Sequence, residues 1–414
     1  MKRVYIVGAF DFDNYGDLLF PLIAAYRLNN CGFDVIPVAP TAKQTAFLDA
    51  IPHIDVKTML TGNDLVDGIL IGGGWIIHNQ PVENLAVYNS ENVGKWASVG
   101  FWLSGVLAGA IRNVPIIWNA PGVPNPFPSS KLTGIVEPAV DASDYVAVRE
   151  RISANLLVTQ NVDRIHIVPD TAIDISNMWP KEHLQKIFYE LALRESLDVK
   201  HDYAVIHLRR NLGSEDIRMV AGLLDEFMTA QGLTPLIVSI SHIMNDSRMA
   251  TEFAQHLRSP YKLLSNFTSL KEIAACIACS KIYLGTSLHG YVTASAYDIP
   301  GVIIANSAHR RFSGFQEHIG RPRDLARTWR DGLNTAQEHL AAGGIKIISN
   351  PVRTLLDEHW NRVESVLNNP LAGSDRRYQF LCDYLRYGIL QEGVEWGLEP
   401  GITKVFRYRS NEKP

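Results

Sequence analysis

The sequence predicts an α/β protein with two parallel-sheet domains and a helical C-terminal tail. Short, uniformly apolar runs alternate with amphipathic stretches, a pattern typical of parallel strands that helices cover on both faces. The alternation pauses near residues 175–200 and then restarts, which indicates a second unit of similar size. The length of 414 residues agrees with this division, since domains usually have roughly 100–200 residues.

The first unit is expected to contain buried strands joined by helices. Apolar runs predict strands over residues 4–8, 68–72, 114–119, 145–148 and 165–168. Residues 17–29 predict a helix, because apolar side chains recur at helical spacing from Leu18 onward. The apolar stretch 96–111 is shorter than the roughly 20 residues that a membrane-spanning helix needs. We interpret it as a buried helix, with a membrane-facing or dimer-forming surface as the alternative.

The second unit repeats the alternation of apolar and amphipathic stretches but has a different amino-acid sequence. Strands are predicted over residues 203–208, 235–239, 261–264, 281–285 and 300–304, of which 300–304 is the last strand. Helices are predicted between them over residues 181–195, 216–231, 247–257, 269–279 and 288–297, and then over 324–342, 351–368 and 374–390. We therefore predict an N-terminal domain over residues 1–180, a second domain over 181–323, and a helical tail over 324–414 that packs across the domain junction.

The composition excludes several classes of protein. There are 39 Lys and Arg and 43 Asp and Glu residues, so the net formal charge is −4, which excludes a basic, nucleic-acid-binding surface over the whole protein. Four cysteines are too few for a disulfide scaffold and fit a reducing compartment. Cys276 and Cys279 form a C-x-x-C pair in an alanine-rich helical stretch. Because no second pair lies nearby, we interpret them as structural, and we expect no metal and no cofactor.

The N-terminal residues predict where the protein resides. They run directly into a predicted strand, without the apolar core and cleavage site of a signal peptide. We therefore expect a cytoplasmic protein, and peripheral attachment to the inner face of the membrane stays open.

Ligands of open α/β sheets bind beyond the carboxyl ends of the strands, and the first domain carries unusual residues at two such ends. Asn14, Gly16 and Asp17 follow the first strand, where Asp17 begins a helix and can cap it, or can face a sugar hydroxyl or a reacting proton. No glycine-rich nucleotide fingerprint occurs there. Gly72-Gly73-Gly74 allows either a tight turn or close approach of the backbone to a ligand, and Trp75 offers a platform for a sugar ring.

The second domain carries two further strand ends of this kind. Arg209 and Arg210 follow its first strand and predict an anion site, with a solvated arginine pair as the alternative. Ser287 is placed to cap the next candidate helix, so that the N–H groups of Leu288, His289 and Gly290 would face an oxyanion in the cleft. His289 can donate to a phosphate or move a proton, although a lone histidine is more often structural. Two more cations, Arg310 and Arg311, follow the last predicted strand.

At these residues the chain resembles the polysaccharide pyruvyl transferase family. The resemblance rests on the Asn14-x-Gly16-Asp17 turn, Gly72-Gly73-Gly74, Tyr145-Val-Ala-Val-Arg149-Glu-Arg-Ile-Ser153, Val168-Pro-Asp170, the Arg209 strand, and Leu288-His289-Gly290 with Ala294 and Pro300. Each motif is weak alone, but their order and spacing together are fairly specific. The resemblance implies two Rossmann-like domains arranged as in GT-B glycosyltransferases, with the acceptor held by the N-terminal domain and the donor by the second.

The resemblance also implies a reaction. Family members transfer a pyruvyl group from phosphoenolpyruvate to two hydroxyls of one sugar of a cell-surface glycan, which gives a cyclic ketal and phosphate. They hold the donor with an Arg-Leu-His triplet and an upstream arginine. Leu288 and His289 match the last two positions of the triplet, and the upstream arginine maps to Arg209 or Arg210, with Arg209 favoured.

The chain departs from the family pattern in two places. Ser287 stands where the family usually has the arginine of the triplet, and Arg310 or Arg311 stands for a family lysine. These changes either compensate each other in charge or signal another donor or a lost activity. His289 and Asp17 are the candidates for the acid and the base of the reaction, with the direction of proton transfer open.

Two alternatives remain at this stage. One is a nucleotide-sugar glycosyltransferase of the same architecture, and the other is a non-catalytic glycan-binding relative, which Ser287 keeps open. The sequence also leaves open whether the acceptor is lipid-linked and whether the chain forms a homo-oligomer.

Overall fold

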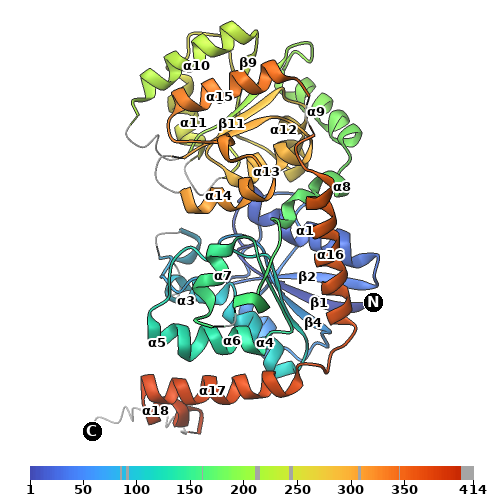
Figure 1. Ribbon diagram of the computed structural model, residues 1–414, viewed down its shortest axis with the longest axis vertical. Coiled ribbons are helices and arrows are strands. Elements are labelled where there is room, and N and C mark those ends of the chain that lie inside the picture. The colour runs from blue at the N-terminus through green and yellow to red at the C-terminus, as the bar shows by residue number, and fades with distance from the viewer. Residues whose placement is uncertain are drawn as a thin grey trace, which may run out of the picture.

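The computed structural model describes residues 1–83, 86–89, 93–160, 162–209, 215–241, 246–305, 309–344 and 346–401, with the backbone alone at 86 and 309–311. It contains two α/β domains stacked end to end (Figure 1). Each domain is built on its own parallel sheet, which confirms the predicted fold class.

The first sheet has seven strands in the order β3-β2-β1-β4-β5-β6-β7. The strands are β1 (Lys2–Val7), β2 (Phe33–Ala39), β3 (Ile54–Asp55), β4 (Gly68–Ile71), β5 (Ile116–Asn119), β6 (Tyr145–Val148) and β7 (His166–Ile167). β2 and β3 lie outside the predicted set. β2 contains the exposed Asp34 and also Pro37, which a strand tolerates where one of its edges is unpaired. These two residues interrupt the apolar run that marked the other strands.

The second sheet has six strands in the order β10-β9-β8-β11-β12-β13. The strands are β8 (Tyr203–His207), β9 (Thr234–Val238), β10 (Lys262–Leu264), β11 (Ile282–Gly285), β12 (Gly301–Ile304) and β13 (Leu325–Ala326). The prediction that the strand at 300–304 is the last is therefore wrong, since β13 pairs in parallel with β12. A strand of two residues is too short to leave a pattern in the sequence.

Helices connect the strands within the described residues. In the first half they are α1 (Tyr15–Asn29), α2 (Val56–Thr61), α3 (Val93–Gly100), α4 (Leu103–Arg112), α5 (Ser129–Lys131), α6 (Glu137–Ala142), α7 (Arg151–Leu157), α8 (Ile175–Met178) and α9 (Lys181–Glu195). In the second half they are α10 (Ile217–Gln231), α11 (Asp246–Ala254), α12 (Leu270–Ala278), α13 (Leu288–Ala296), α14 (His309–His318), α15 (Trp329–Ala342), α16 (Asn350–Leu367), α17 (Ser374–Glu392) and α18 (Val394–Leu398).

The apolar stretch predicted as one helix over 96–111 forms two helices, α3 and α4. The break falls at Phe101 and Trp102, whose side chains are both buried. The Trp102 indole N–H donates to the carbonyl of His78 at 3.1 Å, so the chain turns where the ring enters the core. Among the described residues, none of the helices combines the length and the apolar character needed to cross a membrane.

The C-terminal helices divide between the two domains. α15 packs against β12 and β13 of the second sheet, whereas α16 returns and packs against β6 of the first (Figure 1). Its buried His359 ring lies 3.1 Å from the Tyr145 hydroxyl, and its Trp360 N–H donates to Asp174 at 2.9 Å. The chain thus ties the two domains together a second time. The division at residues 180 and 323 stays a prediction.

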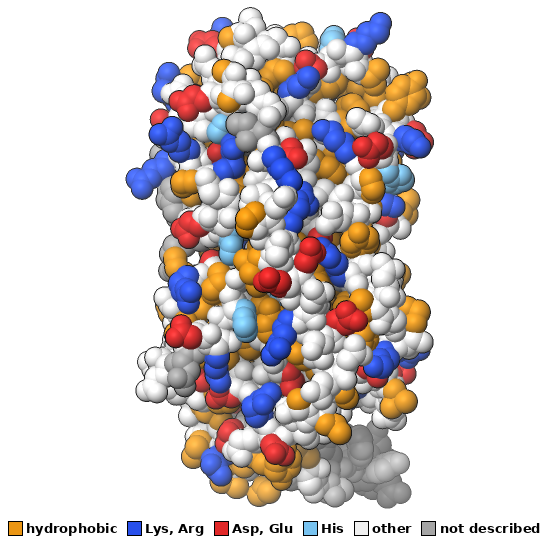
Figure 2. Space-filling model, turned by 45° about the vertical axis from the view of Figure 1, so that its right-hand side comes forward, with side chains coloured by type: hydrophobic (Ala, Val, Ile, Leu, Met, Phe, Trp, Pro, Cys, Tyr) orange, Lys and Arg blue, Asp and Glu red, His pale blue; other side chains and the backbone are white. Residues whose placement is uncertain are grey.

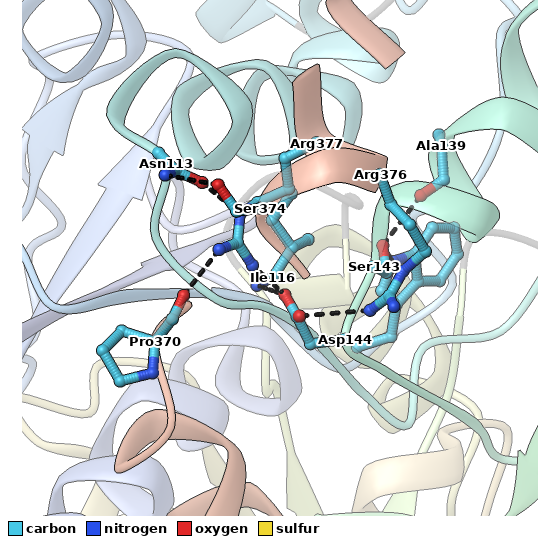
Figure 3. Close-up of polar contacts among 10 residues, drawn as sticks. Asn113, Ile116, Ala139, Ser143, Asp144, Pro370, Ser374, Arg376 and Arg377 are labelled. Carbon is cyan, nitrogen blue, oxygen red and sulfur yellow. Dashed lines mark hydrogen bonds and ion pairs between the residues drawn. The ribbon is translucent and has the colours of Figure 1, made fainter. Parts of the chain in front are cut away.

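α17 lies at the end of the first domain that faces away from the second domain (Figure 1). Its first turn is held by Arg377, which is fully buried. The Arg377 guanidinium donates to Asp144 at 2.7 Å, to Asn113 at 3.0 Å and to the Pro370 carbonyl (Figure 3). Asp144 in turn accepts the backbone N–H of Ile116 at 2.9 Å. This network fixes the start of α17 to the first sheet.

Candidate functional site

A cavity of about 210 Å³ lies between the two domains, at the carboxyl ends of the strands of both sheets. In each sheet the strand order reverses beside the first strand, since β1 has β2 on one side and β4 on the other, and β8 has β9 and β11. Open α/β sheets bind ligands at this reversal. The cavity is lined by Ala9, Phe12, Asn14, Asp17, Trp75, Ile76, His78, Val82, Phe101, Arg149, His207, Arg209, Ile240, Ser241, Asp246, Ser287, Leu288 and His289.

Half of the predicted site residues line this cavity. The lining includes Asn14, Asp17, Trp75, Arg209, Ser287, Leu288 and His289. Gly16, Gly74 and Gly290 lie directly beside lining residues in the chain, and Gly73 lies two residues before Trp75. Arg210 lies outside the described residues, and Arg310 and Arg311 belong to the first turn of α14, where only the backbone is described.

Gly16 has a steric role that spacing alone did not reveal. A Cβ atom at this position would collide with the imidazole of His289, because α1 of the first domain and α13 of the second pack closely here. Gly73 is required in a similar way, since a Cβ there would enter the ring of Phe20, which itself packs edge-on against His289. The two glycines therefore let the first domain approach His289.

His289 lies close to a carboxylate across the domain junction. Its Nε2 lies 3.6 Å from Oδ2 of Asp170, which is buried, and Nη1 of Arg149 lies 3.3 Å from the same oxygen. Burial raises the pKa of Asp170, but the neighbouring His289 and Arg149 side chains outweigh it and lower the pKa to about 2. Arg149 is also paired with Glu150 at 3.1 Å. His289 is therefore held by an ionised carboxylate of the other domain.

The first turn of α1 forms the opposite wall. The expectation that Asp17 begins this helix is wrong, since the helix starts at Tyr15 and Asn14 occupies the N-cap. The reason is a contact between the domains, because Asn14 forms a β-bridge with Ser241 and the Tyr15 N–H donates to Ile240 at 3.2 Å. Asp17 instead accepts a hydrogen bond from the Asn14 side-chain amide at 2.5 Å. A carboxylate and an amide thus face the cavity together.

The second-domain wall contains a capped helix and a buried histidine. Ser287 is the N-cap of α13, and its hydroxyl accepts from the Gly290 N–H at 3.3 Å, as predicted. His207 ends β8, and its Nε2 lies 3.0 Å from Oδ2 of Asp246. The Thr286 hydroxyl lies 3.4 Å from the other ring nitrogen of His207. The His207–Asp246 pair thus lies against the loop from which α13 starts.

Sequence reasoning assigned no role to several of these residues. Arg149 and Asp170 lie inside the motifs that carry the family resemblance, so their joint position at strand ends was a usable signal. His207 lies two residues before Arg209 on the same strand end. Asp246 gave no signal, because an acidic residue at the start of a helix is common at any helix.

Solved structures with the same fold were found, with low sequence identity. A Staphylococcus aureus protein, MnaA, solved with UDP, matches with a TM-score of 0.55 and 11% identity over 89% of this chain and 97% of that one. A putative UDP-N-acetylglucosamine 2-epimerase from Listeria monocytogenes matches with a TM-score of 0.54 and 12% identity over 91% and 97% of the chains. A UDP-GlcNAc 2-epimerase from Methanocaldococcus jannaschii matches with a TM-score of 0.54 and 12% identity over 89% and 100%. The two-domain arrangement is therefore GT-B-like.

The sequence was also compared with curated proteins and with family models. No curated protein matches the chain. A model of the polysaccharide pyruvyl transferase family matches residues 14–308. This span includes the Asn14 turn, Arg209 and His289, and it contains most of both domains. The chain belongs to the polysaccharide pyruvyl transferase family.

Proposed function

We propose that the protein transfers a pyruvyl group from phosphoenolpyruvate to two hydroxyls of one acceptor sugar. Both hydroxyl oxygens bond to C2 of the enol ester, and the bond between C2 and the phosphate oxygen breaks. One hydroxyl proton is balanced by the proton that converts the methylene carbon to a methyl group, and the other leaves with the phosphate. The products are a cyclic ketal and inorganic phosphate.

The convergence of Arg209, His289 and the N-terminus of α13 on one cavity carries this proposal. The donor has a phosphate and a carboxylate, so it requires several positive groups. A guanidinium binds either anion with two parallel hydrogen bonds, and the first N–H groups of a helix lack partners within the helix. Arg149 brings a second guanidinium to the cavity from the first domain.

His289 and Asp17 supply the proton transfers in this proposal. The Asp170 carboxylate lies 3.6 Å from the His289 ring, and an imidazole is a suitable acid to protonate the methylene carbon. Asp17 lies on the other wall beside Asn14 and suits the base that takes the proton of the sugar hydroxyl. Trp75 in the same lining offers an apolar face to the sugar ring.

Two measurements test the proposal. The protein is incubated with phosphoenolpyruvate and a panel of saccharides, and released phosphate is measured. We expect release that requires both the protein and a sugar. In parallel, thermal unfolding is followed with phosphoenolpyruvate or with UDP-sugars, since a ligand bound only by the folded state raises the unfolding temperature.

Arg209→Ala tests the donor site, and Arg330→Ala is its matched control because Arg330 is exposed on α15, outside the cavity. Phosphoenolpyruvate is expected to stabilise the wild type and Arg330→Ala but not Arg209→Ala. Stabilisation by UDP-sugars alone would favour a nucleotide-sugar transferase instead. No response to either ligand, together with no phosphate release, would favour a glycan-binding protein without catalysis.

A further inference from the structure

A second cavity, of about 410 Å³, lies at the far end of the first domain, between α4, residues 127–136 and the C-terminal helices. Its volume is within the range of small-molecule sites. Five aromatic side chains line it, from segments far apart in the sequence: Trp102, Phe127, Tyr384, Tyr387 and Trp396. We call this space the aromatic cavity.

Polar groups lie among these rings. The lining also contains Asn79, Lys131, Gln391 and Glu392. The Tyr387 hydroxyl is buried and has no hydrogen-bond partner among the residues that the structure describes. A buried hydroxyl without a partner costs roughly 1–3 kcal/mol, so a ligand that supplies the missing bond gains affinity. The aromatic cavity therefore suits a ligand that has both apolar faces and hydrogen-bonding groups.

Hydrogen bonds and close packing hold the walls of the aromatic cavity in place. The Arg377 network fixes the start of α17 (Figure 3). A Cβ at Gly134 would collide with the ring of Tyr387, and one at Gly388 would collide with the ring of Trp396. Lys131 lies over the Tyr387 ring, with Nζ 5.1 Å from its centroid. The two glycines thus make room for rings that line the space.

The aromatic cavity and the cavity between the domains take lining residues from the same two segments. His78 and Phe101 line the cavity between the domains, while the next residue after each, Asn79 and Trp102, lines the aromatic cavity. The Trp102 N–H donates to the His78 carbonyl at 3.1 Å, which joins the two linings. Both cavities are therefore partly lined by the first domain.

We propose that the aromatic cavity binds a sugar unit of the acceptor glycan, away from the unit that reacts. A pyranose ring offers C–H faces to the aromatic rings, and its hydroxyls can reach Lys131, Glu392 and the Tyr387 hydroxyl. A hydrocarbon chain would desolvate these polar groups without replacing their hydrogen bonds, which is unfavourable. The acceptor role of this sugar site rests on the proposed function.

Other ligands of this region would contact different residues. Leu385, Leu390 and Leu398 of the same helices are exposed, and hydrophobic side chains gather at this end of the molecule (Figure 2). A second copy of the chain or a lipid surface would cover these leucines, whereas a sugar would contact the aromatic lining. Variants of the two groups separate these cases.

The test is calorimetric titration of the protein, without phosphoenolpyruvate, with trisaccharides of glucose, galactose or mannose. We expect saturable binding of at least one of them. Trp396→Ala is expected to weaken this binding at least tenfold and Tyr387→Phe, which removes only the hydroxyl, severalfold. Leu390→Ala is the matched control, because Leu390 is on α17 but outside the lining, and it is expected to bind like the wild type.

Absence of saturable binding by all three trisaccharides overturns the proposal, and so does equal binding by Trp396→Ala. It is also overturned if the leucine and aromatic variants instead change the oligomeric state or the binding to phosphatidylglycerol vesicles. The titration involves no turnover, so it is independent of the phosphate-release assay. Binding that meets these criteria supports the sugar site even if no phosphate is released. The missing release then contradicts the proposed function and not the sugar site.

Discussion

Two histidines of the second domain each face a buried carboxylate, but the two pairs are assembled differently. His207 and its partner Asp246 both belong to the second domain, and both are almost fully buried. His289 belongs to the second domain and its partner Asp170 to the first. The His207 pair therefore forms when one domain folds, whereas the His289 pair forms only when the two domains are in this arrangement.

This difference suggests different roles: His207 positions other residues, and His289 takes part in the proposed reaction. His207 also lines the cavity between the domains, but it is 1% exposed and lies against Thr286 in the loop that starts α13, so we expect it to position other groups. His289 is 9% exposed and packs against Phe20 and Gly16 of the first domain. Its orientation thus depends on both domains, which links their arrangement to the group that we propose as the acid. Removal of each histidine or of its contacts tests this distinction.

The largest effect is expected from His289→Gln. Glutamine keeps a hydrogen-bonding group near Asp170 but cannot act as an acid, and general acid catalysis is typically worth about 10²–10⁴-fold in rate. We expect phosphate release to fall by about that factor, with an unchanged circular dichroism spectrum. A fall of less than tenfold would remove His289 from the acid role.

Gly16→Ala is expected to have the next largest effect. The added methyl group collides with the His289 ring and displaces it, and a displacement of about 1 Å can cost about 10²-fold in rate. Gly222→Ala is the control, because a Cβ there meets nothing within 4 Å and Gly222 lies within α10. The control is expected to keep its rate and to gain roughly 0.5–1 kcal/mol of stability. Equal rates for both variants would contradict the packing role.

Asp170→Asn removes the charge that holds His289. The lost interaction with the carboxylate charge predicts a rate about tenfold lower. The pKa of Asp170 is lowered from 3.8 to about 2, so its ionised form contributes about 2 kcal/mol of stability. That contribution is complete above pH 4 and is lost as the pH falls through 2. Urea midpoints between pH 2 and 5 are therefore expected to change less in the variant than in the wild type, and parallel pH curves would contradict the ion pair.

His207→Leu is expected to have the smallest effect on rate and a clear effect on stability. Leucine has no hydrogen-bonding group, so Asp246 would lose its hydrogen bond at a buried position, which typically costs about 1–3 kcal/mol. Urea unfolding measures this loss, and the rate is expected to fall by less than for Asp170→Asn. If the rate falls as far as for His289→Gln, His207 takes part in the chemistry and the distinction between the two histidines fails.

Sequence patterns predicted uniformly apolar strands and long amphipathic helices well. β6 and α9 both have the predicted bounds. The patterns missed β2, where Asp34 and Pro37 interrupt the apolar run, and they joined α3 to α4 across Trp102. In each case, a local signal was outweighed by a contact with another part of the chain.

For the site, chain position identified the strand ends that meet at the cavity, because parallel strands place their carboxyl ends on one edge. It identified Arg209, Ser287 and His289 before any partner was known. It could not pair His289 with Asp170, which lies 119 residues earlier in the chain.

The order of residues by itself determined that there are two parallel-sheet domains, that Ser287 is a cap and that charged groups stand at strand ends, since these follow from local periodicity and backbone chemistry. Only the tertiary structure decided that Gly16 leaves room for His289, that Asp170 holds its ring, and that α17 returns to enclose the aromatic cavity. Such contacts depend on how the two domains and the C-terminal helices pack, and packing at long sequence separation leaves no period in the chain.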